Sequence, residues 1–194
     1  MAVPCPHCGR RYDETLFAYG RTLHCTCGAR VGAGTRAEPA GEPRFAADAM
    51  LGRLARWLRV LGFDTTWQAH VPDEALVRHA LEQERTLLTR DRRLPEEWTR
   101  VPVFVLHAED LRGQLAELGA RFALSSRARP FTRCNRCNET LVPASEAEVG
   151  EHVPPAVRAR HQGFLRCPRC GRVYWAGSHV ARMRALLAEP RPSG

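Results

Sequence analysis

Two aspartates that end apolar segments are the residues of this chain best placed to do chemistry. Asp48 ends the segment FAAD, which begins at Phe45, and Asp91 ends TLLTRD, which begins at Thr86. Arginines precede and follow Asp91. If both segments are parallel strands, their aspartates share the carboxyl edge of one sheet. Carboxylates that meet beside arginines are what a metal-dependent phosphodiesterase needs.

Each candidate acid also has a purely structural interpretation. Asp48 can cap a helix that begins near Ala49, and Asp73 follows a proline at a helix start, where acids favour the helix dipole. Asp91 can pair with an adjacent arginine, and Asp110 can cap a third helix. Against this, clustered carboxylates repel one another unless a cation lies between them. Mg²⁺ or Mn²⁺ would suit such a cluster, since Mg²⁺ uses few protein carboxylates.

Eight cysteines form two quartets on either side of a cysteine-free middle. The second quartet has two CxxC pairs, the spacing of a tetrahedral zinc ribbon, whereas the first pairs CxxC with a shorter CxC. His7 and His24 lie beside the first quartet as substitute ligands. We expect two structural zinc ions, because disulfides and thioredoxin-like redox chemistry fit paired knuckles less well. The expected ligands are Cys5, Cys8, Cys25, Cys27, Cys134, Cys137, Cys167 and Cys170.

The chain of 194 residues has a net charge of +8 and no lysine. A compositional bias explains the missing lysine, but it leaves the positive excess, which favours a polyanion such as nucleic acid. No apolar run reaches the length of a membrane span, and MAVPCPHCGR lacks the pattern of a secretory signal. We therefore expect a cytoplasmic protein with no membrane partner; the oligomeric state is left open.

The middle of the chain predicts strands that alternate with helices. Strands are expected at 45–47, 65–68, 86–89 and 101–106, and helices near 49–61, from 72, and at 109–118. The first helix has an apolar face that runs from Met50 to Leu61, and Arg53, Arg56 and Arg59 are expected on its other side. Gly62 should end it. Helices between strands imply a parallel sheet covered on both faces.

Three modules follow from this pattern. An N-terminal zinc ribbon at 1–35 and a C-terminal one at 131–188 flank an α/β domain at 44–124. The segments 36–43 and 125–130 are expected to be linkers, because they contain Pro, Gly, Ser and charged residues.

The motifs together resemble the Mut-seven C-terminal RNase family over about residues 44–187. The segments that carry the resemblance are Phe45–Leu61, Asp64, the acidic helix start at Asp73, LLTRDRRL, FTRCNRCN, and CPRCGRVYWAGSH with Arg182 and Met183. That family joins a PIN-like nuclease domain to a zinc ribbon. The resemblance implies a PIN-like three-layer fold around a parallel sheet, flanked here by two ribbons.

The resemblance also implies site residues. The first acid of the family maps to Asp48, whereas Asp73 and Asp91 are similar to the third and fourth acids of PIN nucleases. The second acid has no clear counterpart, and Glu74 or Asp110 are candidates to supplement the site. In the closing motif, Trp175 can stack on a base and His179 can contact a phosphate. We favour the alternative that Trp175 covers the zinc knuckle and Ser178 caps the last helix.

The sequence therefore predicts a metal-dependent ribonuclease. Asp48, Asp73 and Asp91 would hold Mg²⁺ or Mn²⁺, and Arg53, Arg90 and Arg92 would bind the RNA backbone. One alternative is an RNA- or ribosome-binding protein that uses the same scaffold without cutting, which the missing second acid supports. A second alternative is a scaffold whose ribbons bind other proteins.

Overall fold

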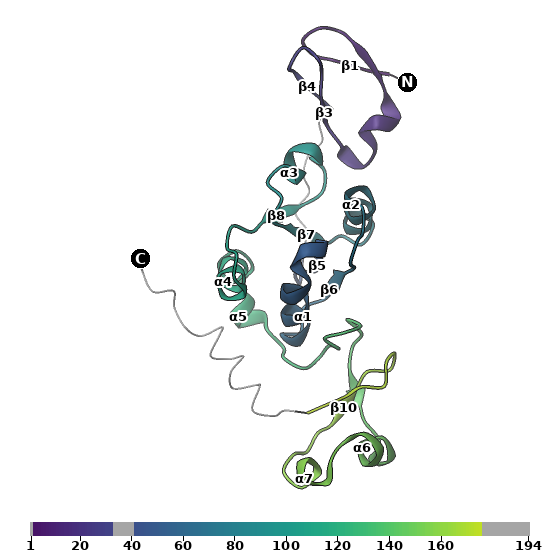
Figure 1. The fold of residues 1–194 in the computed structure, drawn as a ribbon, viewed down its shortest axis with the longest axis vertical. Coiled ribbons are helices and arrows are strands. Elements are labelled where there is room, and N and C mark those ends of the chain that lie inside the picture. The colour runs from purple at the N-terminus through teal and green to yellow at the C-terminus, as the bar shows by residue number, and fades with distance from the viewer. Residues whose placement is uncertain (1, 33–40, 176–194) are drawn as a thin grey trace, which may run out of the picture. The chain divides into compact units, whose positions relative to one another are not determined.

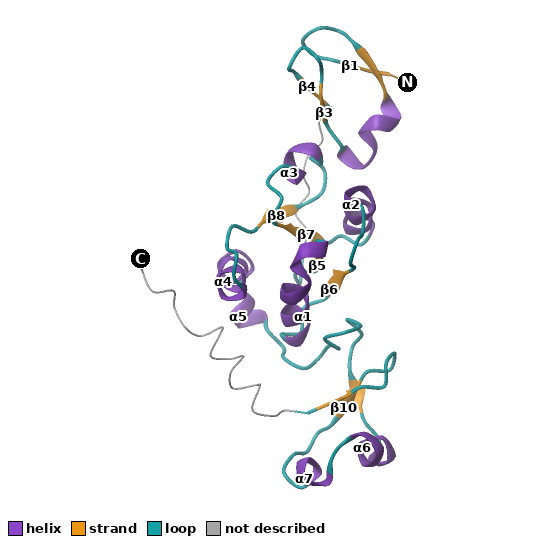
Figure 2. Ribbon diagram, in the orientation of Figure 1, coloured by secondary structure: helices purple, strands orange, loops and turns teal. Residues whose placement is uncertain are grey.

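The computed structural model describes residues 2–32 and 41–175. Figures 1 and 2 trace its helices and strands along the chain. Contacts divide the chain into two units, one made of residues 1–52 and 67–107, the other of residues 53–66 and 108–194. The division into three modules stays a prediction. Ser178, His179, Arg182, Met183 and most of the first expected linker lie outside the described residues.

A four-stranded sheet of order β6-β5-β7-β8 forms the centre of the fold. Its strands are β5 (Phe45–Ala47), β6 (Thr65–Trp67), β7 (Thr86–Thr89) and β8 (Val103–Val105). β5 pairs with β7, and β7 with β8, in parallel. The mixed α/β fold class with a parallel sheet is thus confirmed, and all four expected strands are present.

The two central strands are buried on both of their faces. Every residue of β5 and β7 is buried, as expected for parallel strands with material on both sides. Ala46 and Leu87 share a core with three residues of α2 (Asp73–Glu82), which are Leu76, Val77 and Ala80. This core fixes the carboxyl edge of the sheet, where β5 is followed by Asp48 and β7 by Arg90 and Asp91.

The expected first helix is present, but two of its residues are oriented differently from the prediction. It begins as a 3-10 turn, η2 (Ala49–Leu51), continues as α1 (Gly52–Val60), and is followed by Gly62 with φ +96°. Met50 is 61% exposed, not part of the apolar face. A 3-10 turn has three residues per turn, so Met50 is out of phase with the α-helical stripe that follows.

Arg59 is the second correction, because it is buried instead of lying on the polar side. Its side chain is 5% exposed. The guanidinium group donates to the carbonyl of Thr65 at 2.8 Å and to those of Asn135 and Arg136 at 3.2 and 2.9 Å. A buried charge is tolerated when it is hydrogen-bonded. Periodicity could not show these acceptors, since two of them lie more than 70 positions along the chain.

Three further helices follow along the chain. α3 (Leu94–Glu97) follows the carboxyl edge of β7, and α4 (Leu111–Phe122) is the expected third helix with shifted bounds. α5 (Leu124–Arg127) occupies part of the second expected linker. The amides of Arg129 and Phe131 then bond the carbonyls of Leu61 and Val60, at 2.9 and 3.0 Å. This segment is therefore fixed to the end of α1 and is not a free linker.

The cysteine-containing regions are built from short antiparallel hairpins. At the N-terminus, β1 (Ala2–Pro4) pairs with β2 (Arg11–Asp13), and β3 (Leu23–His24) with β4 (Arg30–Val31), joined by η1 (Glu14–Gly20). The C-terminal sheet has the order β11-β10-β9. Its elements are β9 (Val142–Pro143), β10 (Leu165–Arg166) and β11 (Val173–Tyr174), with α6 (Glu146–His152) and α7 (Pro155–Arg158) between β9 and β10.

In the part of the chain that the structure describes, no helix combines the length and the apolar character needed to cross a bilayer.

Candidate metal centres and acidic edge

The eight cysteines meet in two groups of four. One group contains Cys5, Cys8, Cys25 and Cys27, and the other Cys134, Cys137, Cys167 and Cys170. Within each group, one sulfur atom per residue lies within 4.8 Å of all the others. Both quartets of the sequence are therefore brought together by the fold. The cysteines also form the small cores of the two regions, with Cys5, Cys25, Cys134 and Cys167 buried.

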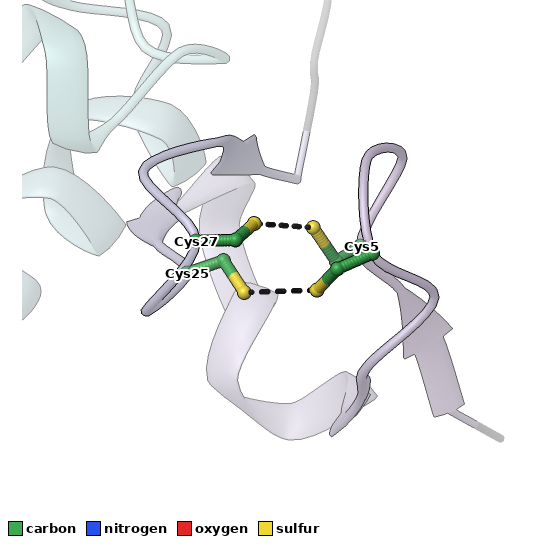
Figure 3. A group of neighbouring side chains, drawn as sticks. Cys5, Cys25 and Cys27 are labelled. Carbon is green, nitrogen blue, oxygen red and sulfur yellow. Dashed lines mark hydrogen bonds between the residues drawn. The ribbon is translucent and has the colours of Figure 1, made fainter.

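The sulfur–sulfur distances suit a tetrahedral metal ion and not a disulfide. Cys5 and Cys27 are 3.6 Å apart, Cys8 and Cys25 are 3.5 Å apart, and Cys134 and Cys170 are 3.8 Å apart. Figure 3 shows Cys5 from the first knuckle facing Cys25 and Cys27 from the second. Four sulfurs about 2.3 Å from a central zinc ion would be about 3.8 Å from one another. All eight cysteines are free thiols.

All four knuckles share one backbone turn, although one of them is shorter. The residue after each second cysteine has positive φ, with values of 72°, 87°, 67° and 71° at Gly9, Gly28, Asn138 and Gly171. Its amide bonds the carbonyl of the first cysteine at 2.8–3.0 Å. Glycine and asparagine tolerate this conformation best. The CxC pair closes the same turn with one residue fewer, so it can supply two ligands.

The N-terminal quartet favours thiolate at one of its buried members. A backbone hydrogen bond from Cys27 and a side-chain hydrogen bond from Tyr12 lower the pKa of Cys25 to about 5. Metal binding requires thiolate, and such hydrogen bonds stabilise it. His7 and His24 are exposed, and the group of four consists of cysteines alone.

The C-terminal quartet has a comparable stabilising contact. Burial opposes ionisation of Cys134, but hydrogen bonds from the Tyr174 hydroxyl and the Cys137 amide lower its pKa to about 7. The Tyr174 oxygen lies 3.1 Å from that sulfur and 3.1 Å from Asn135 Oδ1, and its single hydroxyl proton serves one of these two acceptors at a time. Trp175, predicted to cover the knuckle, has its ring 6.3 Å from that of Phe164.

A second set of contacts fixes the first C-terminal knuckle to the end of α1. The Asn138 side chain accepts from the Thr65 amide at 3.0 Å and donates to Asp64 at 2.7 Å. Arg133 forms an ion pair with the same aspartate at 3.7 Å. Together with the hydrogen bonds of Arg59, these contacts fix the loop that carries Cys134 and Cys137, because they involve both the backbone and the side chains of that loop.

At the carboxyl edge of the sheet, one threonine joins two of the predicted acids. The Thr89 hydroxyl donates to Asp48 Oδ2 at 2.6 Å and accepts from the Asp91 amide at 3.0 Å. Thr89 is fully buried. The Asp48 side chain makes no helix cap, and Asp91 accepts from the amide of Arg93 at 2.8 Å. The capping interpretation of Asp48 is therefore wrong.

Asp73 responds to the other two acids through their charge. It begins α2 and is exposed. Even so, partial desolvation and then the negative charges of Asp48, Asp91 and Glu97 raise the pKa of Asp73. A helix N-terminus would by itself favour the charged form. The direction of the shift indicates that desolvation and the repulsion among the acids together outweigh the dipole.

The acids are nevertheless more widely spaced than the cysteines. Among the described residues, only the two cysteine quartets bring three or more metal-binding side chains within 4.8 Å of one another. Asp110 caps α4 by accepting from the Gly113 amide at 3.0 Å, as its structural interpretation predicted. Glu74 is exposed in the first turn of α2. Arg53, Arg90 and Arg92 are all exposed.

Thr89 is the one residue of this edge that sequence reasoning missed. The sequence predicts it only as the last residue of the strand at 86–89. Its place two residues before Asp91 is the signal in the sequence, whereas its burial and its need for hydrogen-bond partners appear only in the folded sheet.

Comparison with known proteins identifies the family to which this chain belongs. Residues 43–187 match the model of the Mut7-C RNAse domain. The chain belongs to this family. The resemblance stated from the sequence is thus confirmed, and RNase-type function is what the family indicates. The N-terminal quartet lies outside the matched residues. No curated protein and no solved structure matched the chain.

Proposed function

We propose that this Mut7-C family member is a ribonuclease that requires a divalent cation. Asp48, Asp73 and Asp91 would hold Mg²⁺ or Mn²⁺, which suits carboxylate oxygens. When bound, such a cation activates water and stabilises the charge that develops on a phosphate. The observation that carries the proposal is the link between Asp48 and Asp91 through the Thr89 hydroxyl; partial desolvation and then the charges of these two acids raise the pKa of Asp73. Acids that repel one another in this way gain most from a cation.

The protein residues of this edge have separable roles. The Thr89 hydroxyl orients the carboxylate of Asp48, and it also fixes the backbone from which Asp91 extends. Since Thr89 donates to Oδ2 of Asp48, the other oxygen of that carboxylate is left for a ligand. Asp91 is held in turn by the Arg93 amide. The fold therefore orients the carboxylates of Asp48 and Asp91 before any cation binds.

Arginines supply the contacts to the RNA backbone. Arg90 and Arg92 are exposed on either side of Asp91, and Arg53 is exposed near the start of α1. Guanidinium groups bind phosphate through paired N–H donors, so they suit a sequence-independent grip on RNA. The net charge of +8 adds a longer-range attraction. Binding of this kind weakens as salt rises.

Both cysteine quartets would hold structural zinc. Their free thiols, their sulfur distances and their shared backbone turn all fit a tetrahedral thiolate site. A zinc ion with four protein ligands has no open position, so the quartets would contribute stability and not chemistry. The C-terminal ribbon would also help to orient RNA.

Cleavage of labelled single-stranded RNA tests the proposed activity. The wild-type protein should cut RNA in the presence of Mg²⁺ or Mn²⁺. Cutting should stop when chelator is added in excess of the divalent cation, for a time too short to remove the zinc ions. Binding to the same RNA is measured in parallel by a shift assay. Cutting that continues at the same rate in chelator would contradict the role of the cation.

The wider spacing of the acids favours one alternative, an RNA-binding protein that does not cut, and the same cleavage assay tests it. The carboxylates at this edge fall outside the 4.8 Å grouping that the cysteines satisfy. If the wild-type protein binds RNA in a salt-sensitive way and never cuts it, the scaffold is an RNA-binding protein instead.

A further inference from the structure

The N-terminal ribbon contacts the segment that follows Asp91, mainly through hydrogen bonds to backbone carbonyls. The Thr22 amide donates to the carbonyl of Glu97, and the Thr22 hydroxyl donates to that of Glu96. Gly20 accepts from the amide and hydroxyl of Thr99, at 2.8 and 3.1 Å. Arg21 and Trp98 form an antiparallel bridge between these two stretches.

These bonds satisfy the part of α3 that most needs partners. The last carbonyl groups of a helix have no N–H donors within the helix itself. In a helix of four residues, this exposes most of the turn to competing conformations. The carbonyls of Glu96 and Glu97 receive both of their ribbon donors from the single residue Thr22, which is 5% exposed.

Apolar packing adds to the contact. Tyr19 packs against the core cluster that contains Leu94, Trp98 and Val101. The Arg21 guanidinium lies 5.5 Å from the centre of the Trp98 ring. Gly20 is buried with φ +78°, and a Cβ atom there would collide with the side chain of Arg100. The junction therefore requires glycine at this position for two independent reasons.

The other end of α3 reaches the acidic edge. Asp91 Oδ1 accepts from the Arg93 amide at 2.8 Å, directly before the helix begins. A displacement of the helix would move this amide and with it the carboxylate. Thr22 and Asp91 are thus linked through one turn of helix.

We propose that the N-terminal ribbon positions Asp91, with Thr22 as the positioning residue that fixes α3. The proposal rests on the proposed function, because it assigns Asp91 to the divalent-cation site. It gives a role to the region outside the Mut7-C match. Thr22 lies three positions before Cys25, so an ordered quartet also orders the donor.

Thr22→Val and Thr22→Ser, each in the full chain, separate positioning from general structure. Valine keeps the shape and removes the hydroxyl donor, whereas serine keeps the donor. Hydrogen exchange of the backbone amides of residues 93, 94 and 96–99 should be faster in Thr22→Val by about fivefold to tenfold and unchanged in Thr22→Ser. The Mn²⁺ concentration for half-saturation should rise by a similar factor, while the zinc content stays the same.

Unchanged exchange and unchanged Mn²⁺ binding in Thr22→Val would overturn the proposal. If that variant releases zinc, Gly20→Ala decides by the same two readouts, because it forces the junction apart away from the cysteines. Faster exchange in a protein whose wild type binds no Mn²⁺ and cuts no RNA would support the contact with α3. That result would refute the ribonuclease proposal separately.

Discussion

The cysteine quartets and the acidic edge are both candidate metal centres, but the fold prepares them differently. In each quartet the four sulfurs already lie within 4.8 Å of one another, whereas the acids form no such group among the described residues. The quartets are closed by backbone turns that would form the same way around any tetrahedral ion. The acids are oriented singly, through Thr89 and the Arg93 amide. The difference is the one expected between a closed structural metal site and a site that would leave positions open for water and substrate.

The largest effect is expected from removing one ligand of a closed site. Cys170→Ser should reduce the zinc content from two ions per chain to one, because three thiolates hold the ion less well. The C-terminal region should then lose its fold, since zinc binding contributes roughly 10 kcal/mol or more to such modules. Elemental analysis and limited proteolysis measure the two effects. A variant that keeps two zinc ions and resists proteolysis would contradict the quartet assignment.

A smaller effect is expected when the knuckle keeps its ligands and loses its external contact. Arg59→Met leaves the carbonyls of Asn135 and Arg136 without their donor, so the free energy of unfolding should fall by about 2 to 4 kcal/mol. Denaturant titration measures this loss. Arg56→Met is the matched control, because that arginine is exposed on the same helix. Equal losses in both variants would show that the carbonyl contacts are not the cause.

The stability that depends on Asp73 should fall as pH rises, which is opposite to the behaviour of a carboxylate in an ion pair. The folded-state pKa of Asp73 is raised above its unfolded value. The folded protein therefore binds the proton more tightly, and stability falls as pH rises from the unfolded pKa through the raised one. Above that range, without divalent cations, Asp73→Asn should melt at a higher temperature than wild type. Added Mg²⁺ should narrow the gap.

Melting curves at low and neutral pH, with and without Mg²⁺, check this prediction. At a pH below both pKa values the two proteins should melt alike, apart from any small effect of the amide. A gap that is the same at both pH values would show that repulsion among the acids contributes nothing.

These two kinds of site also differ in how far the sequence predicts them. Cysteine spacing gave all eight sulfur positions, and the strands before Asp48 and Asp91 placed both acids at one edge. Local patterns could not give the partners of Arg59, because the acceptors at Asn135 and Arg136 come from a distant loop. Met50 failed for a different reason, since a helical period assumes an α-helix where the chain makes a 3-10 turn. Thr89 was missed because burial and hydrogen bonding are properties of the folded sheet.

The smallest effect is expected at the exposed arginines. Arg92→Ala should weaken binding to single-stranded RNA and reduce the slope of log K against log salt by about 0.7, the value for one phosphate contact. Arg160→Ala, which removes an exposed arginine far along the chain from the acids, should change the slope less. Fluorescence anisotropy over a salt series measures both. An identical slope in the two variants would remove Arg92 from the substrate-binding residues.

Cleavage of RNA by Asp48→Asn tests the central claim most directly. Asparagine keeps the shape and the contact with Thr89 but removes the charge that attracts Mg²⁺ or Mn²⁺. Asp110→Asn is the control, because asparagine also caps a helix. We predict that Asp48→Asn folds, binds RNA and does not cut it, while Asp110→Asn cuts normally. An Asp48→Asn protein that folds and cuts at the wild-type rate would contradict the assignment.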